Sequence, residues 1–219
     1  MSDQAIESTS VRMVLTAKAK VALTRGVLFF RKLWVLALLL LSTEQAEAKE
    51  VVLEGKASYF LSTNTRFRDV YGGSGLYRLE TQLQVKNAVY AWINLGYMYA
   101  SGRSSVGSPT HLHFVPLSSG VSYIYQAGRL QPYLGLGPAL AYAYIHNGSN
   151  RVTRHQDGWG GGFLSKIGLL AYFNDQFFFD FFADYSFIRM SYHHTDKEVT
   201  RHKGDLSGLS FGMGLGYQF

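Results

Sequence analysis

The chain has 219 residues, no cysteine and a formal charge of +6, with 15% aromatic and 16% charged residues. The lack of cysteine excludes disulfides and thiolate metal sites, and the charged fraction is low against about 25% for soluble domains. The length fits one domain, with or without a removable leader.

The longest apolar run lies near the start of the chain, in LWVLALLLL at residues 33–41. It follows Arg31 and Lys32 and precedes a small-x-small triplet that ends at Ala48, which is the pattern of a secretory signal peptide. The run is too short to cross a bilayer as a helix, which takes about 20 residues. We therefore predict a signal peptide at residues 1–48, with Met13 as an alternative start, and a mature domain at residues 49–219.

After residue 50, apolar residues alternate with small or polar ones at a period of two, which predicts β-strands. In each segment one face carries Leu, Ile, Phe and Tyr, whereas the other carries mostly Gly, Ala, Ser and charged residues. The last segment, for example, sets Met213 and Leu215 against Gly212, Gly214 and Gly216. The segments are eight in number, in chain order 51–61, 76–85, 89–100, 111–125, 132–144, 159–173, 177–189 and 208–219.

The connections between these segments alternate in length. Short turns at one end and long loops at the other are typical of a transmembrane barrel, and eight strands place both termini at the short-turn end. The sequence therefore predicts an all-β, eight-stranded, antiparallel up-and-down transmembrane β-barrel. The short turns are 86–88, 126–131 and 174–176, and the longer polar loops are 62–75, 101–110, 145–158 and 190–206.

A soluble eight-stranded barrel with an apolar interior is the competing architecture. A narrow interior is filled by side chains, and large residues from every strand would overfill it. We therefore expect the small and charged residues inside and the large ones facing lipid. Aromatic residues near both strand ends predict two interfacial girdles. They are Tyr59, Tyr77, Tyr97, Tyr99, Tyr142 and Tyr144 near the loops, and Tyr123, Tyr125, Phe173, Phe179, Tyr217 and Phe219 near the turns.

The last strand carries a resemblance to a known family. Leu215, Tyr217 and Phe219 end an alternating apolar series that closes with an aromatic residue. This series resembles the C-terminal signal by which bacterial outer-membrane proteins are recognised for barrel assembly. The mature chain resembles small outer-membrane barrels of the OmpW, OmpX and OmpA type, and the stretches PLSSGVSYIY (116–125) and PYLGLGPALAY (132–142) are most similar to OmpW-like members.

The resemblance implies an integral protein of the bacterial outer membrane, exported through its signal peptide. Its partners would be outer-membrane lipid, including lipopolysaccharide, and the barrel-assembly machinery. It transfers no catalytic residue and no cofactor. The GMGLG stretch looks like a phosphate-binding loop, but no helix follows it, so we expect no nucleotide there.

Charged residues on the predicted inner face depart from the hydrophobic interior associated with OmpW-like barrels. Buried charges must pair or meet water. The leading hypothesis is a salt-bridged plug inside a structural barrel that displays its loops; the alternatives are a gated polar pore and an apolar channel for small solutes. The inner charges are Glu54, Lys56, Arg78, Glu80, Lys166, Asp180 and Asp184.

The predicted loops and rims carry nearly all of the surplus positive charge. Arginine binds phosphate groups bidentately, so we expect contact with lipopolysaccharide phosphates; a host polyanion or surface protein is the alternative, and nucleic acid is disfavoured. This basic rim consists of Arg66, Arg68, Arg103, Arg151, Arg154, Arg189, Arg201 and Lys203.

All seven histidines fall in or beside the same loops. They could converge on a metal ion or respond to pH, although polar loops also collect histidine without such a role. A lipid-modifying enzyme is a minor alternative, because Ser191 and His193 lie near Asp196 but do not match the compact His-Ser pair of barrel deacylases. We expect no enzyme and no metal site.

Pro116 and Pro138 lie inside predicted central strands. A closed barrel has no free edge to accommodate their missing N–H groups. We expect β-bulges or register shifts at both positions.

Overall fold

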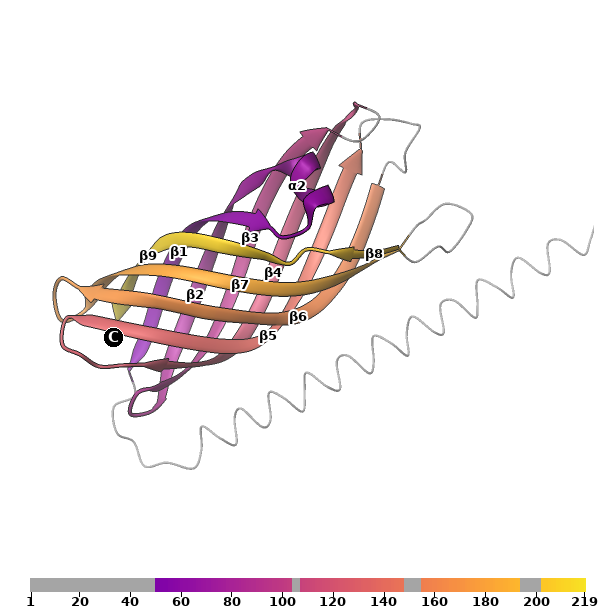
Figure 1. The fold of residues 1–219 in the computed structure, drawn as a ribbon. Helices are drawn as coiled ribbons and strands as arrows, with labels where there is room; N and C mark the ends of the chain where they lie inside the picture. Colours follow the sequence, from indigo (N-terminus) through magenta and orange to yellow (C-terminus); the bar gives the residue numbers. More distant parts are fainter. Residues whose placement is uncertain (1–49, 104–106, 148–154, 194–201) are drawn as a thin grey trace, which may run out of the picture. The chain divides into compact units, whose positions relative to one another are not determined.

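Strands make up most of the chain that the structure describes. The computed structural model describes residues 50–103, 107–147, 155–193 and 202–219 (Figure 1). The strands are β1 (Val51–Ser62), β2 (Gly73–Lys86), β3 (Val89–Arg103), β4 (Pro109–Ile124), β5 (Leu130–Asn147), β6 (His155–Tyr172), β7 (Phe177–His193), β8 (His202–Asp205) and β9 (Gly208–Gln218). The predicted signal peptide lies outside the described residues.

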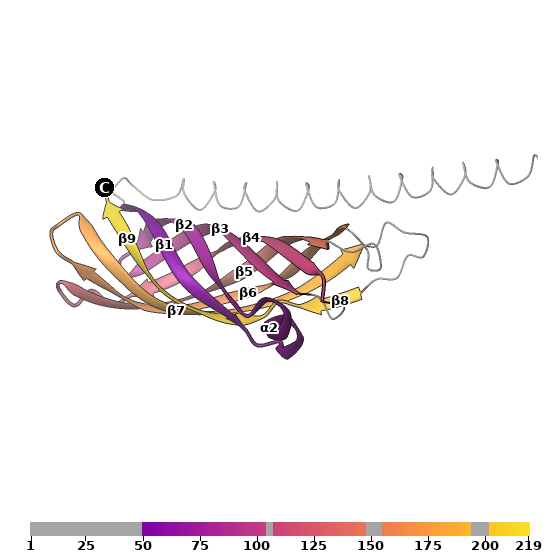
Figure 2. The same ribbon diagram turned by 90° about the horizontal axis from the view of Figure 1, so that it is seen from above.

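The sheet closes on itself, as both views of the ribbon show (Figure 1, Figure 2). Strands β1 to β7 pair antiparallel with their neighbours in sequence, and β9 pairs with both β1 and β7. The short β8 pairs with β7 in the same register as β9 does, so β8 and β9 form one interrupted barrel strand. The described residues thus form a closed eight-stranded antiparallel barrel, and the predicted fold class is confirmed.

The interruption between β8 and β9 has a local cause. The Asp205 side chain accepts the backbone N–H of Ser207 at 2.9 Å, and the Ser207 hydroxyl also bonds it. Such a side-chain turn competes with the strand ladder for the backbone. Leu206 and Ser207, both buried, lie between the two strands, and the chain then resumes in the same register as β9.

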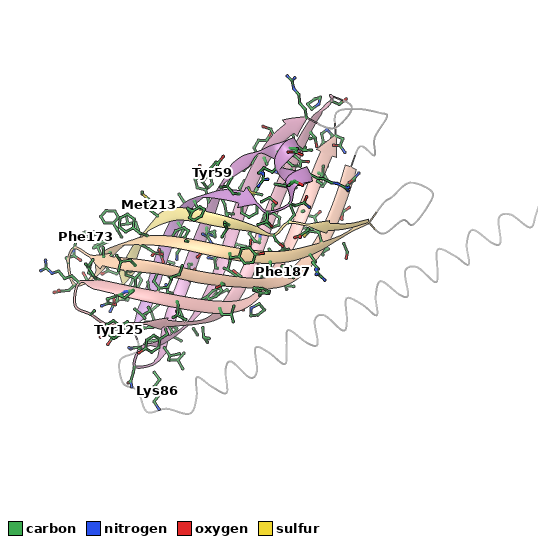
Figure 3. The ribbon with its side chains drawn as sticks, in the orientation of Figure 1. Tyr59, Lys86, Tyr125, Phe173, Phe187 and Met213 are labelled. Carbon is green, nitrogen blue, oxygen red and sulfur yellow. The ribbon has the colours of Figure 1, made fainter. Side chains whose placement is uncertain are left out.

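Burial alternates along the strands as the sequence pattern predicts. On β3, Ile93 and Leu95 are exposed, whereas Trp92 and Asn94 are buried. Large apolar side chains project from the outer wall of every barrel strand, and Figure 3 labels several of them, among them Tyr59, Phe173 and Met213. An apolar surface that surrounds the whole barrel is the surface that a lipid bilayer covers.

The aromatic residues near the strand ends lie on this outer wall. Tyr77 at the loop half is 64% exposed, and Phe219 at the turn half is 70% exposed. At the turn end, the Tyr217 ring contacts Phe219 and Phe177 edge-on, at 4.7 and 4.8 Å between centroids. Amphipathic rings at these two levels suit the two interfaces of a membrane.

The expected bulges at Pro116 and Pro138 do not occur in the described strands, so that prediction is wrong. The β3–β4 and β4–β5 ladders each lose two pairs beside a proline and then resume in the same register. A proline removes one N–H donor but inserts no residue, so the ladder has a local gap and no offset. The register shift in the described ladders lies between Gln84 and Lys86, beside the β2–β3 turn.

The predicted loop at residues 62–75 contains a helix that the sequence pattern did not indicate. Helix α2 (Thr65–Tyr71) begins after Asn64, whose side chain accepts the Arg66 N–H, and ends at Gly72, where φ is 64°. These are standard caps for the two ends of a helix. The Tyr71 hydroxyl bonds that of Thr110 on β4 at 3.0 Å, which ties α2 to the loop end of the barrel.

Among the described residues, no helix has the length and apolar composition needed to cross a membrane.

Candidate functional site

The side chains inside the barrel form an apolar cluster in each half, with charged residues between them. The loop-half cluster includes Phe60 and Met190, and the turn-half cluster includes Val52 and Phe178. The charged residues lie on β1, β2, β6 and β7, between the two clusters. We call them the charged belt: Glu54, Lys56, Arg78, Glu80, Lys166, Asp180 and Asp184, each at most 7% exposed.

Lys56 lies among three acids of the belt. Its Nζ is 2.8 Å from Asp180 Oδ2, 3.2 Å from Glu54 Oε2 and 3.4 Å from Glu80 Oε1. The Tyr133 hydroxyl also donates to Asp180 Oδ2, at 2.8 Å. Lys56 therefore connects acids from β1, β2 and β7 across the interior.

Glu80 has further donors besides Lys56. Lys166 donates to Glu80 Oε1, the Gln82 amide donates to the same oxygen at 3.0 Å, and the Asn94 amide donates to Oε2 at 2.9 Å. The Lys166 ammonium also lies 4.5 Å from the centre of the Trp92 ring. A buried carboxylate with this many donors stays ionised at little cost.

Arg78 and Asp184 form the remaining ion pair of the belt. The Arg78 guanidinium also stacks on the Phe182 ring, with 4.8 Å between its centre and the ring centroid. An arginine held between a carboxylate and an aromatic face has little freedom to move. This pair fixes β2 and β7 to each other across the interior.

The structure thus brings together all seven predicted inner charges. Four further polar partners, Gln82, Asn94, Trp92 and Tyr133, contact the belt and were not among the predicted site residues. They share the inner face with the charges by the same alternation of period two. The alternation of inward and outward positions along each strand could have placed these four residues on the inner face. Only the register between strands shows which charged residue each of them contacts.

The expectation that the inner face holds only small and charged residues is wrong in part. Phe60, Trp92 and Phe178 are also inside and are at most 3% exposed. They fit because glycines face them on neighbouring strands. A Cβ added to Gly216 would lie 2.1 Å from the Phe178 ring, so the ring occupies the space that the glycine leaves. Alternating large and small residues is how a narrow barrel interior is filled.

A polar cavity of about 300 Å³ opens at the turn end of the barrel. The rings of Tyr90 and Tyr172 line it and also pack in or against the turn-half apolar cluster. The Tyr90 hydroxyl donates to Glu50 at 2.6 Å, and that of Tyr172 donates to Gln218 at 2.7 Å. These bonds hold both rings in place as the floor of the cavity.

The described members of the basic rim lie at or near the loop end. Arg66 and Arg68 are exposed on α2, Arg103 is exposed at the end of β3, and the Arg189 guanidinium lies 5.0 Å from the Phe187 ring centroid on the outer wall of β7. Arg151, Arg154 and Arg201 fall outside the described residues, as does the side chain of Lys203.

Two predicted loop histidines are part of the outer aromatic surface. His111 and His113 lie on β4, where their Nδ1 atoms hydrogen-bond the hydroxyls of Tyr99 at 2.7 Å and Tyr97 at 2.9 Å. No group of three or more histidine or acidic side chains within the described residues is placed to hold a metal ion.

The predicted assembly signal at the end of β9 is on the outer wall. Leu215 and Phe219 are exposed there, and Tyr217 is half-buried between Phe177 and Phe219. The side chains therefore form a continuous apolar edge at the turn end, next to the start of β1.

A closed eight-stranded barrel with an apolar outer wall and a charged belt inside defines a small barrel of the outer-membrane type. No family model matches the sequence, and no curated protein matches it. Among solved structures, the fold is similar to that of the outer membrane protein OprG from Pseudomonas aeruginosa, at 16% identity and a TM-score of 0.56, covering 79% of this chain and 97% of that one. The predicted resemblance to small outer-membrane barrels is confirmed at the level of the fold.

Two other solved structures share this fold. The outer membrane protein AlkL in DMPC lipid bilayers is 15% identical with a TM-score of 0.51, covering 81% of this chain and 93% of that one. Ail of Yersinia pestis, in complex with the heparin analogue sucrose octasulfate, is 13% identical with a TM-score of 0.50, covering 80% of this chain and 100% of that one.

Proposed function

We propose that the protein is an integral barrel of the bacterial outer membrane that serves as a closed structural body and displays its loops. The observation that carries this proposal is the interior: a buried belt of ion pairs between two apolar clusters. The proposal includes export through a cleaved signal peptide and docking of the β9 end, with Leu215, Tyr217 and Phe219, on the barrel-assembly machinery.

The energetics of the belt support a closed body. Separating one buried ion pair costs about 3–5 kcal/mol when a charge is left without its partner. A solute path through the belt would have to separate several such contacts, because Lys56 alone joins Glu54, Glu80 and Asp180. The apolar clusters on both sides would also have to part. Thermal fluctuations supply too little energy for this to be frequent.

We expect purified protein in a planar lipid bilayer to show almost no ion conductance. The Lys166→Ala variant should also conduct almost nothing, because the apolar clusters above and below the belt are unchanged. Lys86→Ala, at the exposed β2–β3 turn (Figure 3), is the control. Regular single-channel openings in the wild type or in Lys166→Ala would contradict the closed body.

A channel for small solutes is the second candidate, and one feature favours it. A depression of about 380 Å³ on the outer wall, beside the exposed Gly55, is lined also by Lys56 and Arg78. Their side chains are 1% and 3% exposed, so the wall is thin at this point. Uptake of a small apolar compound into vesicles that contain the protein, lost in Gly55→Leu, would support the channel over the closed body.

The loop end is proposed to contact lipopolysaccharide phosphates through its arginines. Arg66 and Arg68 are exposed on the same short helix, which is held in place by the Tyr71 bond to Thr110. Two guanidinium groups on one anchored element can bind phosphate groups together.

Replacing Arg66 and Arg68 together by alanine should weaken binding of lipopolysaccharide to the detergent-solubilised barrel by about tenfold, since each lost charge-assisted contact is worth about 1 kcal/mol or less at an exposed site. Arg129→Ala, an exposed arginine at the opposite end, is the matched control and should bind as the wild type does. Equal affinity of all three proteins would exclude this contact, and tighter binding of a sulfated polysaccharide than of lipopolysaccharide would favour a host polyanion.

A further inference from the structure

The charged belt contains one more acid than base. Its four acids, Glu54, Glu80, Asp180 and Asp184, face three bases, Lys56, Arg78 and Lys166, and the whole set is buried. An unpaired ionised carboxylate in such a place is very costly, and a buried carboxyl avoids that cost by taking up a proton. The composition of the belt therefore requires one additional positive charge.

The ion pairs show where the excess acid lies. Asp184 has Arg78, and Glu80 has Lys166 together with two amide donors. Glu54 and Asp180 are left to share Lys56, which lies 3.2 Å from one and 2.8 Å from the other. One ammonium group cannot neutralise two carboxylates and also contact Glu80.

The oxygen atoms of these two acids lack donors when both are ionised. Neither oxygen of Glu54 accepts a hydrogen bond from the described residues, and neither does Asp180 Oδ1. Both carboxyls, however, contact the same ammonium group, at 3.2 Å from Glu54 Oε2 and 2.8 Å from Asp180 Oδ2, so the two acids lie beside each other. A proton on one of them supplies the donor that both need.

We infer that Glu54 and Asp180 share one bound proton, so that the belt is a neutral, proton-loaded plug. Two carboxyls that share one buried ammonium group cannot both ionise, and the pair retains one proton. The ligand of this site is a proton, held between the two carboxyls, and the Lys56 ammonium group neutralises the negative charge that remains on the pair. This inference does not depend on what the loops bind.

Strand β9 makes room for this pair. Gly214 is the register partner of Asp180 on one side and of Lys56 on the other. A Cβ at Gly214 would lie 2.3 Å from Glu54 Oε1. Because β9 has only a glycine there, acids from β1 and β7 meet across the intervening strand.

Every barrel element that faces the pair contributes to its surroundings. The nearest titratable or charged groups are Lys56 on β1, Arg78 and Glu80 on β2, Tyr133 on β5, Lys166 on β6 and Asp184 on β7. Arg78 is paired with Asp184 and Lys166 with Glu80, and Lys56 contacts Glu80 as well as the two acids of the pair, so no base is available to replace the proton.

Infrared spectroscopy of the refolded protein in lipid at neutral pH tests the inference. We expect a carbonyl band of one protonated carboxylic acid, which shifts in part when glutamate is labelled with ¹³C and is lost in Glu54→Gln. Asp69→Asn, an exposed acid on α2, should keep the band. Because the labelling experiment uses the wild-type protein, the test holds even if a variant fails to fold.

Two outcomes would overturn the shared proton. One is a wild-type spectrum without a protonated carboxylic acid at neutral pH. The other is an unfolding midpoint that changes when sodium is replaced by potassium or choline, because a metal cation would then supply the missing charge. A Glu54→Gln barrel that unfolds at the wild-type urea concentration would support the inference, since a neutral amide would replace a carboxyl that is already neutral.

Discussion

Gly162→Ala is expected to destabilise the barrel by about 3 kcal/mol, the upper end of the range for overpacking, or to prevent its closure. The neighbouring Gly161→Ala is expected to change the unfolding free energy by less than about 0.5 kcal/mol, as exposed substitutions do. The two residues are adjacent on β6 and differ in the face on which they lie.

The reason lies in what each added methyl group would meet. A Cβ at Gly162 would lie 1.6 Å from the backbone oxygen of Phe187 and 3.1 Å from the Cα of Ile188 on β7. Backbone atoms of a paired strand cannot move aside without breaking the ladder. A Cβ at Gly161 would lie 3.8 Å from a Leu140 methyl group, which is an ordinary contact.

Urea unfolding in lipid vesicles, followed by the mobility of unheated samples on SDS gels, measures this difference. The wild type and Gly161→Ala should share one midpoint, and Gly162→Ala should unfold at a clearly lower urea concentration or remain unfolded. Equal midpoints for the two variants would contradict the inward position of Gly162.

Glu80→Ala is expected to lower the unfolding free energy by about 3–5 kcal/mol, because it leaves the buried Lys166 ammonium group without its carboxylate partner. Glu80 contacts both Lys166 and Lys56, whose side chains are each 1% exposed, and it accepts the Asn94 amide. Removing the carboxylate takes away the ion-pair partner of Lys166, whereas Lys56 keeps Glu54 and Asp180.

The matched control is Asp69→Ala on α2, where an exposed acid is removed. It should unfold at the wild-type urea concentration. Equal urea midpoints for Glu80→Ala and Asp69→Ala would show that the charged belt does not stabilise the barrel. The comparison with Glu54→Gln is also informative, because the same belt should tolerate the replacement of one of the two acids that share the proton and not the loss of Glu80.

The barrel and its faces could be predicted from the sequence because period-two alternation states directly which residues share a face. Ile93 and Asn94 illustrate this, since one is exposed and the other buried. The contacts inside could not be predicted in the same way. Lys56 and Asp180 are 124 positions apart, and their meeting depends on the registers of β1 and β7 on the strand between them.

The errors have physical reasons as well. The pattern of a single strand does not predict the inner aromatic residues, because the space for a large ring comes from a small residue on the neighbouring strand. Phe178 on β7 occupies the space beside Gly216 on β9. Helix α2 is only seven residues long, too short for a helical period to appear in the sequence. The prolines were expected to shift the register, but a missing donor opens a gap in the ladder without changing the residue count.

The inner face of β9 has a consequence for the order in which the strands of the barrel can assemble. At this face, glycine or serine lies between bulky residues of β1 and β7: Gly216 between Glu54 and Phe178, and Gly214 between Lys56 and Asp180. A strand whose inner face has so little side-chain volume can insert between β1 and β7 after the other seven strands have packed their side chains, without displacing any of those side chains. The strand that joins β1 to β7 is thus one whose inner face carries mostly glycine and serine.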